Sequence, residues 1–187
     1  MVIDNYDGYA AITYGGACTI NVSAVFLNGD YGDNIKRSFT SLIYHEMTHI
    51  WQWYPPMTPT GLIEGIADYT ALKAKYYKPE FFARPGSGKR WDQGYSITAR
   101  FLEYCDGLKP GFLAAMNRKM RNAWILNYFV ELVGKPVDQL WREYKAKYAG
   151  VGNFTEDTNL GLWREHKDMH CYDAKEETGC QLRTLKK

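Results

Sequence analysis

Two histidines and a glutamate in one short stretch have the spacing of a catalytic metal motif. His45, Glu46 and His49 form a His-Glu-x-x-His pattern in an apolar segment with helical periodicity. Residues four apart share a helix face, so both imidazoles can bind one metal ion. Glu46 follows the first histidine, where its carboxylate can take a proton from a metal-bound water. The pattern predicts a zinc site with Glu46 as the general base.

Two acidic residues downstream extend this site. Glu64 and Asp68 are four residues apart in a second helix-like segment, so they also share a face. Two histidines, one glutamate and a water form a catalytic zinc shell, and Glu64 is therefore the expected third ligand. Asp68 is expected to accept the distal N–H of a ligating histidine. The alternative for each of these residues is an ordinary position on a helix surface.

The metal motif needs two helices joined by a short connection. The first is expected to begin near Ser38, a suitable N-cap, and to end before the prolines at 55–56. Its expected buried stripe consists of Phe39, Leu42, Ile43, Met47 and Ile50. The second helix is expected over residues 62–75, with Thr60 as its cap.

The remaining sequence predicts an α+β fold. Residues 2–37 have strand and turn character, with apolar alternation inside 19–25. Further helices are expected at about 95–106, 112–121, 124–133 and 137–148. We therefore expect one domain over residues 1–149, in which a small mixed β-sheet packs on the metal-binding helix and the C-terminal half is mainly helical. Residues 150–187 are polar and are expected to form an extension.

Composition argues against two classes of partner. The net charge is +2, from 23 basic and 21 acidic residues that are interspersed, so no nucleic-acid partner is expected. No apolar run has the length of a membrane span, so no membrane partner is expected. Aromatic residues make up 16% of the chain. That content suits an extracellular domain or a peptide- or carbohydrate-binding cleft and does not decide between them.

Four cysteines are too few for a disulfide scaffold. Cys18 and Cys105 are expected to be small buried residues rather than reactive thiols. Cys171 and Cys180 enclose a polar loop and could close a small ring.

Two further motifs are less specific. Glycosylation sequons begin at Asn21 and Asn153 and are compatible with secretion. His166 and His170 repeat the four-residue spacing, but no glutamate lies between them. A solvated helix end is the favoured interpretation of this pair over a second metal site.

Together these segments resemble the plant basic secretory protein family, which has bacterial and fungal relatives. The matching residues are 44–49 with 52–53, 61–69, 90–95 with 98–102, 140–148 and the strand-like run 7–23. The family groups HExxH zinc-peptidase-like proteins of the gluzincin branch, and the resemblance covers about residues 2–149. It usually has a further N-terminal segment with a signal peptide, so this chain is expected to be N-terminally truncated. The tail from residue 150 has no recognised counterpart.

The resemblance implies a zincin-like fold and a secreted zinc metallopeptidase with one catalytic Zn²⁺, acting as a monomer on a peptide or protein. Tyr95, which opens a helix after a glycine-rich loop, is the candidate donor to the oxyanion, with a packed aromatic as the alternative. An edge strand is expected to align the substrate backbone. Its candidate residues are Ile20, Asn21, Val22, Ser23 and Ala24. A glycan on Asn21 would obstruct this strand, so the two interpretations conflict.

Two rival functions stay open. One is a secreted defence or recognition protein with a structural or vestigial zinc site, whose aromatic residues bind a glycan or a partner. The intact Glu46 argues against it, because a structural site has no use for a general base. The other is a zinc hydrolase that acts on something other than peptides.

Overall fold

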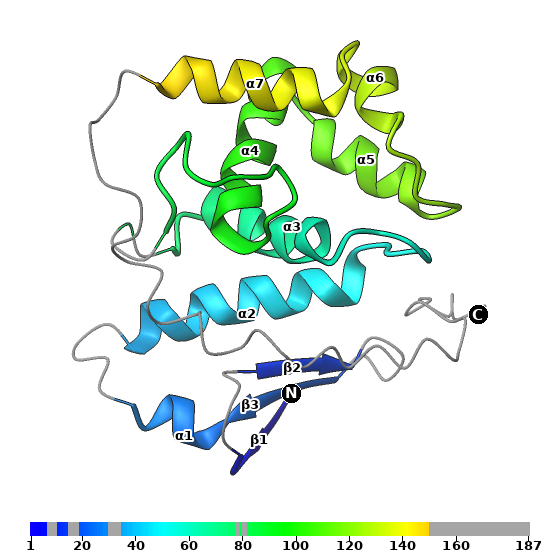
Figure 1. The fold of residues 1–187 in the computed structure, drawn as a ribbon. Helices are drawn as coiled ribbons and strands as arrows, with labels where there is room; N and C mark the ends of the chain where they lie inside the picture. The colour runs from blue at the N-terminus through cyan, green and yellow to red at the C-terminus, as the bar shows by residue number, and fades with distance from the viewer. Residues whose placement is uncertain (7–10, 15–18, 30–34, 78, 80–81, 150–187) are drawn as a thin grey trace.

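A small sheet at the N-terminal end and a helical remainder make up the computed structural model of the chain (Figure 1). It describes residues 1–6, 11–14, 19–29, 35–77, 79 and 82–149. The elements are β1 (Val2–Asp4), β2 (Ala11–Tyr14), β3 (Thr19–Ser23), α1 (Ala24–Leu27), α2 (Ile35–Trp51), α3 (Thr60–Lys73), α4 (Tyr95–Leu108), α5 (Phe112–Met120), α6 (Tyr128–Val133) and α7 (Val137–Tyr148). The expected α+β class is confirmed. The boundary near residue 149 stays a prediction.

The sheet is mixed, as expected, with the strand order β1-β3-β2. β1 pairs with β3 in parallel, with Ile3 opposite Val22. β2 pairs with the other side of β3 in antiparallel fashion, with Thr13 opposite Ile20. The strand order makes β3 the central strand.

This topology corrects the prediction of an edge strand over Ile20–Ala24. Both backbone edges of β3 are already paired within the sheet, so neither is open to a substrate strand. The strand also ends at Ser23, and Ala24 is the first residue of α1. Ser23 ends it because its hydroxyl accepts the Phe26 N–H at 3.2 Å and caps the helix.

The sheet packs against α2, the helix that carries the metal motif (Figure 1). Ile20, Val22 and Leu42 are buried in this contact, with Phe39, Ile43 and Ile50 partly buried against them. The predicted stripe is confirmed except at Met47, which is 47% exposed. Met47 lies with Tyr44 and Trp51 on the opposite side of the helix, because residues at i, i+3 and i+7 share a face.

The predicted helix ends differ from the structure by a few residues. α2 begins at Ile35, three residues before Ser38, and it ends before the prolines as predicted. Thr60 is the first residue of α3, and Pro59 holds the cap position. The helix expected from residue 124 begins at Tyr128, where the backbone N–H bonds to the Ile125 carbonyl in a turn.

A larger aromatic core lies on the other side of α2 and α3. Phe101 of α4 contacts Phe129, Trp141 and Tyr144 with ring centroids 5.4–6.1 Å apart. Cys105 is buried in this core as predicted, and burial raises the pKa of its thiol. This core fixes the helices that stand behind the metal motif.

α3 and α4 approach each other closely at Gly65. A Cβ at this glycine would lie 2.3 Å from Thr98 Cγ2, well inside van der Waals contact. Gly65 directly follows the expected ligand Glu64, so this contact also fixes the part of α3 that carries the ligand.

We expect Gly65→Ala to lower the free energy of unfolding by about 1–3 kcal/mol, because the added methyl overpacks the interface. Gly107→Ala is the matched control, since Gly107 lies in α4 with nothing within 4 Å of its added Cβ. The control should gain up to about 1 kcal/mol from helix propensity. Denaturant unfolding measures both, and equal effects at the two glycines would contradict the close packing.

Candidate metal centre

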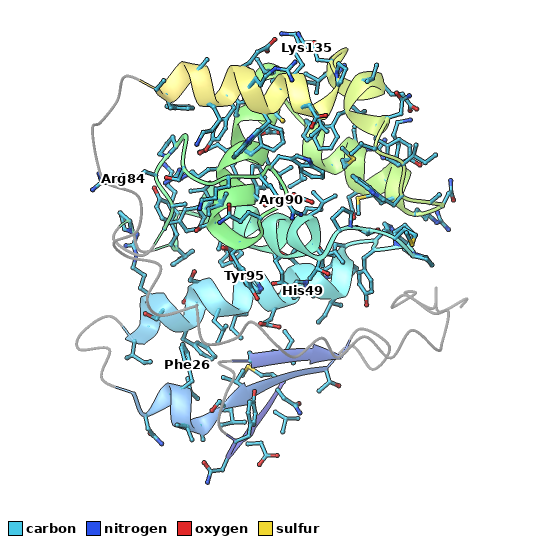
Figure 2. The ribbon with its side chains drawn as sticks, viewed as in Figure 1. Phe26, His49, Arg84, Arg90, Tyr95 and Lys135 are labelled. Carbon is cyan, nitrogen blue, oxygen red and sulfur yellow. The ribbon has the colours of Figure 1, made fainter. Side chains whose placement is uncertain are left out.

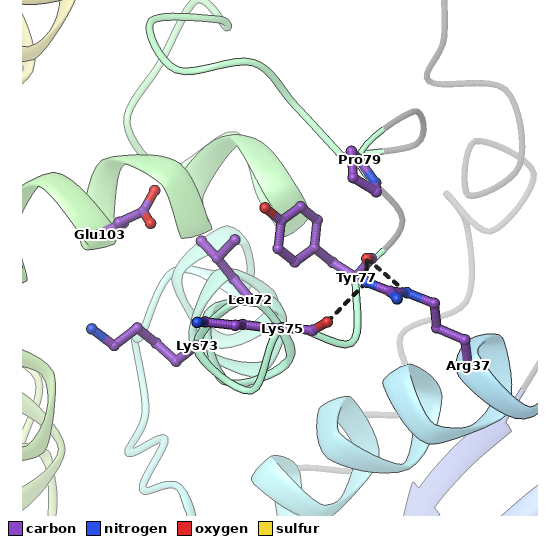
Figure 3. A pocket seen from close by; sticks show the side chains of 7 residues that line it. All are labelled: Arg37, Leu72, Lys73, Lys75, Tyr77, Pro79 and Glu103. Atoms are coloured by element: carbon purple, nitrogen blue, oxygen red, sulfur yellow. Dashed lines mark hydrogen bonds between the residues drawn. The ribbon is translucent and has the colours of Figure 1, made fainter.

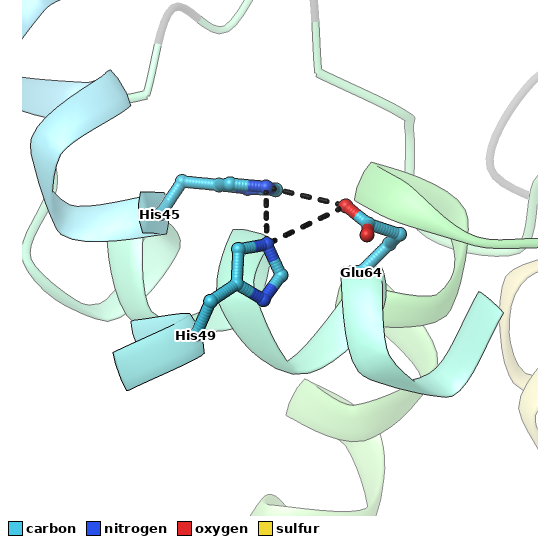
Figure 4. A group of neighbouring side chains, drawn as sticks. All are labelled: His45, His49 and Glu64. Carbon is cyan, nitrogen blue, oxygen red and sulfur yellow. Dashed lines mark hydrogen bonds and ion pairs between the residues drawn. The ribbon is translucent and has the colours of Figure 1, made fainter. Parts of the chain in front are cut away.

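Three potential ligand atoms converge between α2 and α3 (Figure 4). His45 Nε2 and His49 Nε2 are 3.1 Å apart. Glu64 Oε2 lies 3.2 Å from the first of these atoms and 3.8 Å from the second. Donors held tetrahedrally at about 2.1 Å from zinc lie about 3.4 Å from one another. Two nitrogens and one oxygen at these spacings therefore fit a single metal ion.

The expected contact of Asp68 with one of the two histidines is present. Its Oδ1 lies 2.8 Å from His45 Nδ1, on the side of the ring away from the cluster. Asp68 is one turn of α3 after Glu64, so both carboxylates contact the same imidazole from opposite sides. This arrangement fixes the ring plane of His45.

Sequence reasoning missed the partner of the second imidazole. The side-chain amide of Gln52 lies 2.7 Å from His49 Nδ1, and Gln52 is 6% exposed. The signal was available, because Gln52 follows His49 by three residues and residues with that spacing share a helix face. Glutamine is not a usual metal ligand, so the metal motif alone does not single it out.

Electrostatics separates the two histidines in the metal-free cluster. Burial lowers the pKa of His45, but hydrogen bonds and charges from Asp68 and Glu64 outweigh it and raise the pKa well above 6.5. Burial and the charge on His45 lower the pKa of His49 to about 4, although Glu64 acts in the other direction. His45 is therefore the positively charged imidazole of the pair, and His49 stays neutral at neutral pH.

Glu46 lies on α2 directly after the first histidine and is 6% exposed. Within the described part of α2, it and Leu42 are the buried residues. A buried carboxylate beside a polar cluster is unusual for a residue with only a surface role.

Tyr95 opens α4 and stacks on His45. The two ring centroids are 6.2 Å apart and the planes differ by 9°. Tyr95 has a φ of 45°, which is uncommon outside glycine, and its side chain remains 38% exposed. Figure 2 labels Tyr95 and His49 where α2 meets the helices above it. The prediction that Tyr95 opens a helix is confirmed, and its exposure does not fit a core aromatic.

A tight turn fixes the backbone before Tyr95. The Gly94 N–H donates to Thr98 Oγ1, whose own hydroxyl donates to the Trp91 carbonyl, both at 2.8 Å. A Cβ at Gly61 would lie 1.9 Å from the Asp92 carbonyl oxygen, so this loop rests directly on the start of α3. Tyr95 is thus positioned relative to the helix that carries Glu64.

The structure does not bring the predicted substrate residues 20–24 to an open edge. Ile20 and Val22 are buried under α2, and Ser23 is bound to the Tyr6 carbonyl. The Asn21 carbonyl accepts the Tyr6 hydroxyl at 2.8 Å. Some residues singled out in the sequence lie outside the described part of the structure. They are Cys18, Asn153, His166, His170, Cys171 and Cys180.

A pocket elsewhere includes none of the cluster residues (Figure 3). It is lined by Arg37, Leu72, Lys73, Lys75, Tyr77, Pro79 and Glu103. Arg37 donates to the carbonyls of Lys75 and Tyr77 at 3.0–3.4 Å, so its guanidinium holds the segment after α3.

We expect Asp68→Asn to lower the pKa of His45 in the metal-free protein, because the amide brings no charge to oppose burial. The contribution of the His45–Asp68 pair to stability is complete below pH 6.5, the ordinary pKa of histidine. It is lost as the pH rises through the raised pKa of His45. The variant should therefore lose more stability at pH 6 than at pH 9.

NMR titration of the histidine ring protons measures this pKa, and denaturant unfolding at the two pH values measures the stability. Asp138→Asn, at the exposed start of α7, is the control: it should leave the His45 pKa unchanged, and any loss of its favourable charge at the helix N-terminus should be the same at both pH values. If the pKa of His45 is unchanged in Asp68→Asn, Asp68 is not the partner that raises it.

Comparison with known proteins places the chain in a family. A family model described as "Peptidase of plants and bacteria" (BSP) matches residues 1–144. A basic secretory protease of Boswellia serrata is 44% identical over 62 residues, which are 33% of this chain and 72% of the relative. No solved structure matches with statistical significance. Among the described residues, every helix is too short or too polar to cross a membrane. The chain belongs to the basic secretory protease family, the peptidases of plants and bacteria.

Proposed function

We propose that this protein is a zinc metallopeptidase that hydrolyses peptide bonds with a metal-bound water. The observation that carries the proposal is the convergence of His45, His49 and Glu64 in a chain of a peptidase family. Their two nitrogens and one oxygen are donors that zinc prefers, and three protein ligands leave a fourth position for water. Bound there, zinc would lower the pKa of its water to about 7 and polarise the substrate carbonyl.

Glu46 is the general base in this proposal. It directly follows His45 in α2, the position from which the glutamate of an HExxH motif acts on a metal-bound water. It would accept a proton from the attacking water and deliver it to the leaving amine. Burial supports this role, because a carboxylate shielded from bulk water exchanges its proton with the site rather than with solvent.

Tyr95 is the proposed donor to the developing oxyanion. Its ring stacks on His45, and the turn at Gly94 and Thr98 fixes its backbone at the first residue of α4. A donor fixed before the reaction stabilises the oxyanion without reorganising during the chemical step.

The substrate backbone is proposed to pair with β2 in place of β3. β2 is an edge strand in the order β1-β3-β2, and in Figure 1 it lies directly under α2. Within the described sheet, its second edge has no partner strand. Addition of an extended peptide to such an edge supplies main-chain hydrogen bonds close to the metal-binding helix.

An extracellular location is also proposed. The Boswellia serrata relative is named a secretory protease, and this name supports secretion for the present chain. The monomeric state stays a prediction.

Glu46→Gln separates the peptidase from a protein with a structural zinc site. The amide cannot accept a proton, so we expect peptide hydrolysis to fall about 10²–10⁴-fold while zinc content and fold are kept. Zinc is measured by elemental analysis and hydrolysis with a fluorogenic peptide library. Glu131→Gln, on the exposed side of α6, is the control and should retain full activity. Full activity in Glu46→Gln would overturn the mechanism.

Tyr95→Phe keeps the stacked ring and removes only the hydroxyl. Loss of one oxyanion donor should lower kcat about 10²–10³-fold with little change in KM. Tyr76→Phe is the matched control, because Tyr76 is a similarly exposed tyrosine that stacks on Tyr44 instead. Equal kcat values for wild type and Tyr95→Phe would remove the hydroxyl from the mechanism.

A further inference from the structure

The two imidazoles of the cluster have different partners at their distal nitrogens. A carboxylate, Asp68, holds His45 Nδ1 at 2.8 Å. A neutral amide, Gln52, holds His49 Nδ1 at 2.7 Å. Both contacts lie on the side of each ring that faces away from the other ligands.

The backbone fixes Gln52 in place. Its N–H donates to the Thr48 carbonyl at 2.8 Å, so the helical hydrogen bonds of α2 continue one residue past Trp51. From there the side chain reaches back three residues to His49 and is 6% exposed. The neighbouring Trp53 N–H is in turn anchored by the side-chain oxygen of Asn117 at 2.8 Å. A buried amide with this support has one well-defined position.

Metal binding dictates the direction of the hydrogen bond. His49 Nε2 faces His45 Nε2 at 3.1 Å and Glu64 Oε2 at 3.8 Å, so it is the nitrogen that would bind the ion. A neutral imidazole that ligates through Nε2 carries its proton on Nδ1. The group next to His49 Nδ1 must therefore be an acceptor, and the acceptor of a glutamine is Oε1.

An unpaired atom supports this direction. The Gln52 amide is placed with Nε2 toward His49, and its Oε1 is buried without a hydrogen-bond partner among the described residues. The two ends of an amide have nearly the same shape, and a half-turn about the last side-chain bond exchanges them. After that turn Oε1 accepts the His49 Nδ1–H, and the buried oxygen is no longer orphaned.

We propose that Gln52 is a positioning residue that holds His49 in the Nδ1–H tautomer and in the ring orientation required for zinc binding. The inference rests on the proposed zinc site. The hydrogen-bond partners of the two histidines then differ in charge: Asp68 brings a negative charge to His45, and Gln52 brings none to His49. A neutral partner orients the ring without adding a further negative charge close to the site of the oxyanion.

The test measures zinc affinity by competition with a chelating dye, using the full chain. Gln52→Met keeps the length of the side chain and removes the acceptor, so zinc should bind about 10–100-fold more weakly. Gln52→Glu restores an acceptor and should bind within a few-fold of wild type. Gln139→Met, at a half-buried glutamine on α7 that donates to Glu143 far from the cluster, is the control and should bind zinc as wild type does. Circular dichroism verifies that each variant folds.

A second readout reports the hydrogen bond directly. In the zinc-loaded wild type, NMR should show a scalar coupling across the hydrogen bond from His49 Nδ1–H to the side-chain carbonyl of Gln52. This measurement needs no variant, so it tests the role of Gln52 even if Gln52→Met does not fold. Absence of that coupling, or wild-type zinc affinity in Gln52→Met, overturns the proposal.

Zinc binding and peptide cleavage together separate the role of Gln52 from the peptidase activity. A wild type that binds zinc but cleaves no peptide ends the peptidase proposal and leaves the role of Gln52 intact. If Gln52→Met still cleaves peptides and binds zinc as tightly as wild type, the role of Gln52 is wrong and the peptidase proposal stands. A wild type that binds no zinc overturns both.

Discussion

The contact between α2 and α3 is the constraint on which the site depends. Two potential ligands come from α2 and one from α3, and the connection between the helices supplies none of them. The three donor atoms stay within reach of one ion only if the helices keep their relative position. The sheet holds α2 from one side. The loop before α4 holds α3 through the close approach at Gly61, and α4 itself does so at Gly65. Rigid packing on both sides therefore sets the geometry of the cluster.

The same packing determines the electrostatics of the site. Burial alone would keep both imidazoles neutral, yet Asp68 and Glu64 hold a proton on His45 when no metal is bound. A metal cation at the three donors would replace that proton and take over the neutralisation of Glu64. The proposed chemistry then needs a base and a donor beside the ion, and Glu46 of α2 and Tyr95, which opens α4 and stacks on His45, are the candidates.

Local sequence rules found most of the site because the helices obey them. The four-residue spacing identified His45 and His49, and the same rule paired Glu64 with Asp68. The rules failed where the outcome depends on distant parts of the chain. β3 is central because residues 2–4 and 11–14 pair on either side of it, and apolar alternation carries no information on strand order. The positive φ of Tyr95 depends on the loop that rests on Gly61, which no local pattern encodes.

The central claim is that His45, His49 and Glu64 hold one zinc ion, and anomalous diffraction at the zinc edge tests it most directly. Crystals of the zinc-loaded protein should give one strong peak about 2.0–2.2 Å from Nε2 of each histidine and from a carboxylate oxygen of Glu64. Data collected below the edge should lose that peak. A peak bound to other residues, or the absence of a peak in crystals of protein loaded with zinc, would contradict the account.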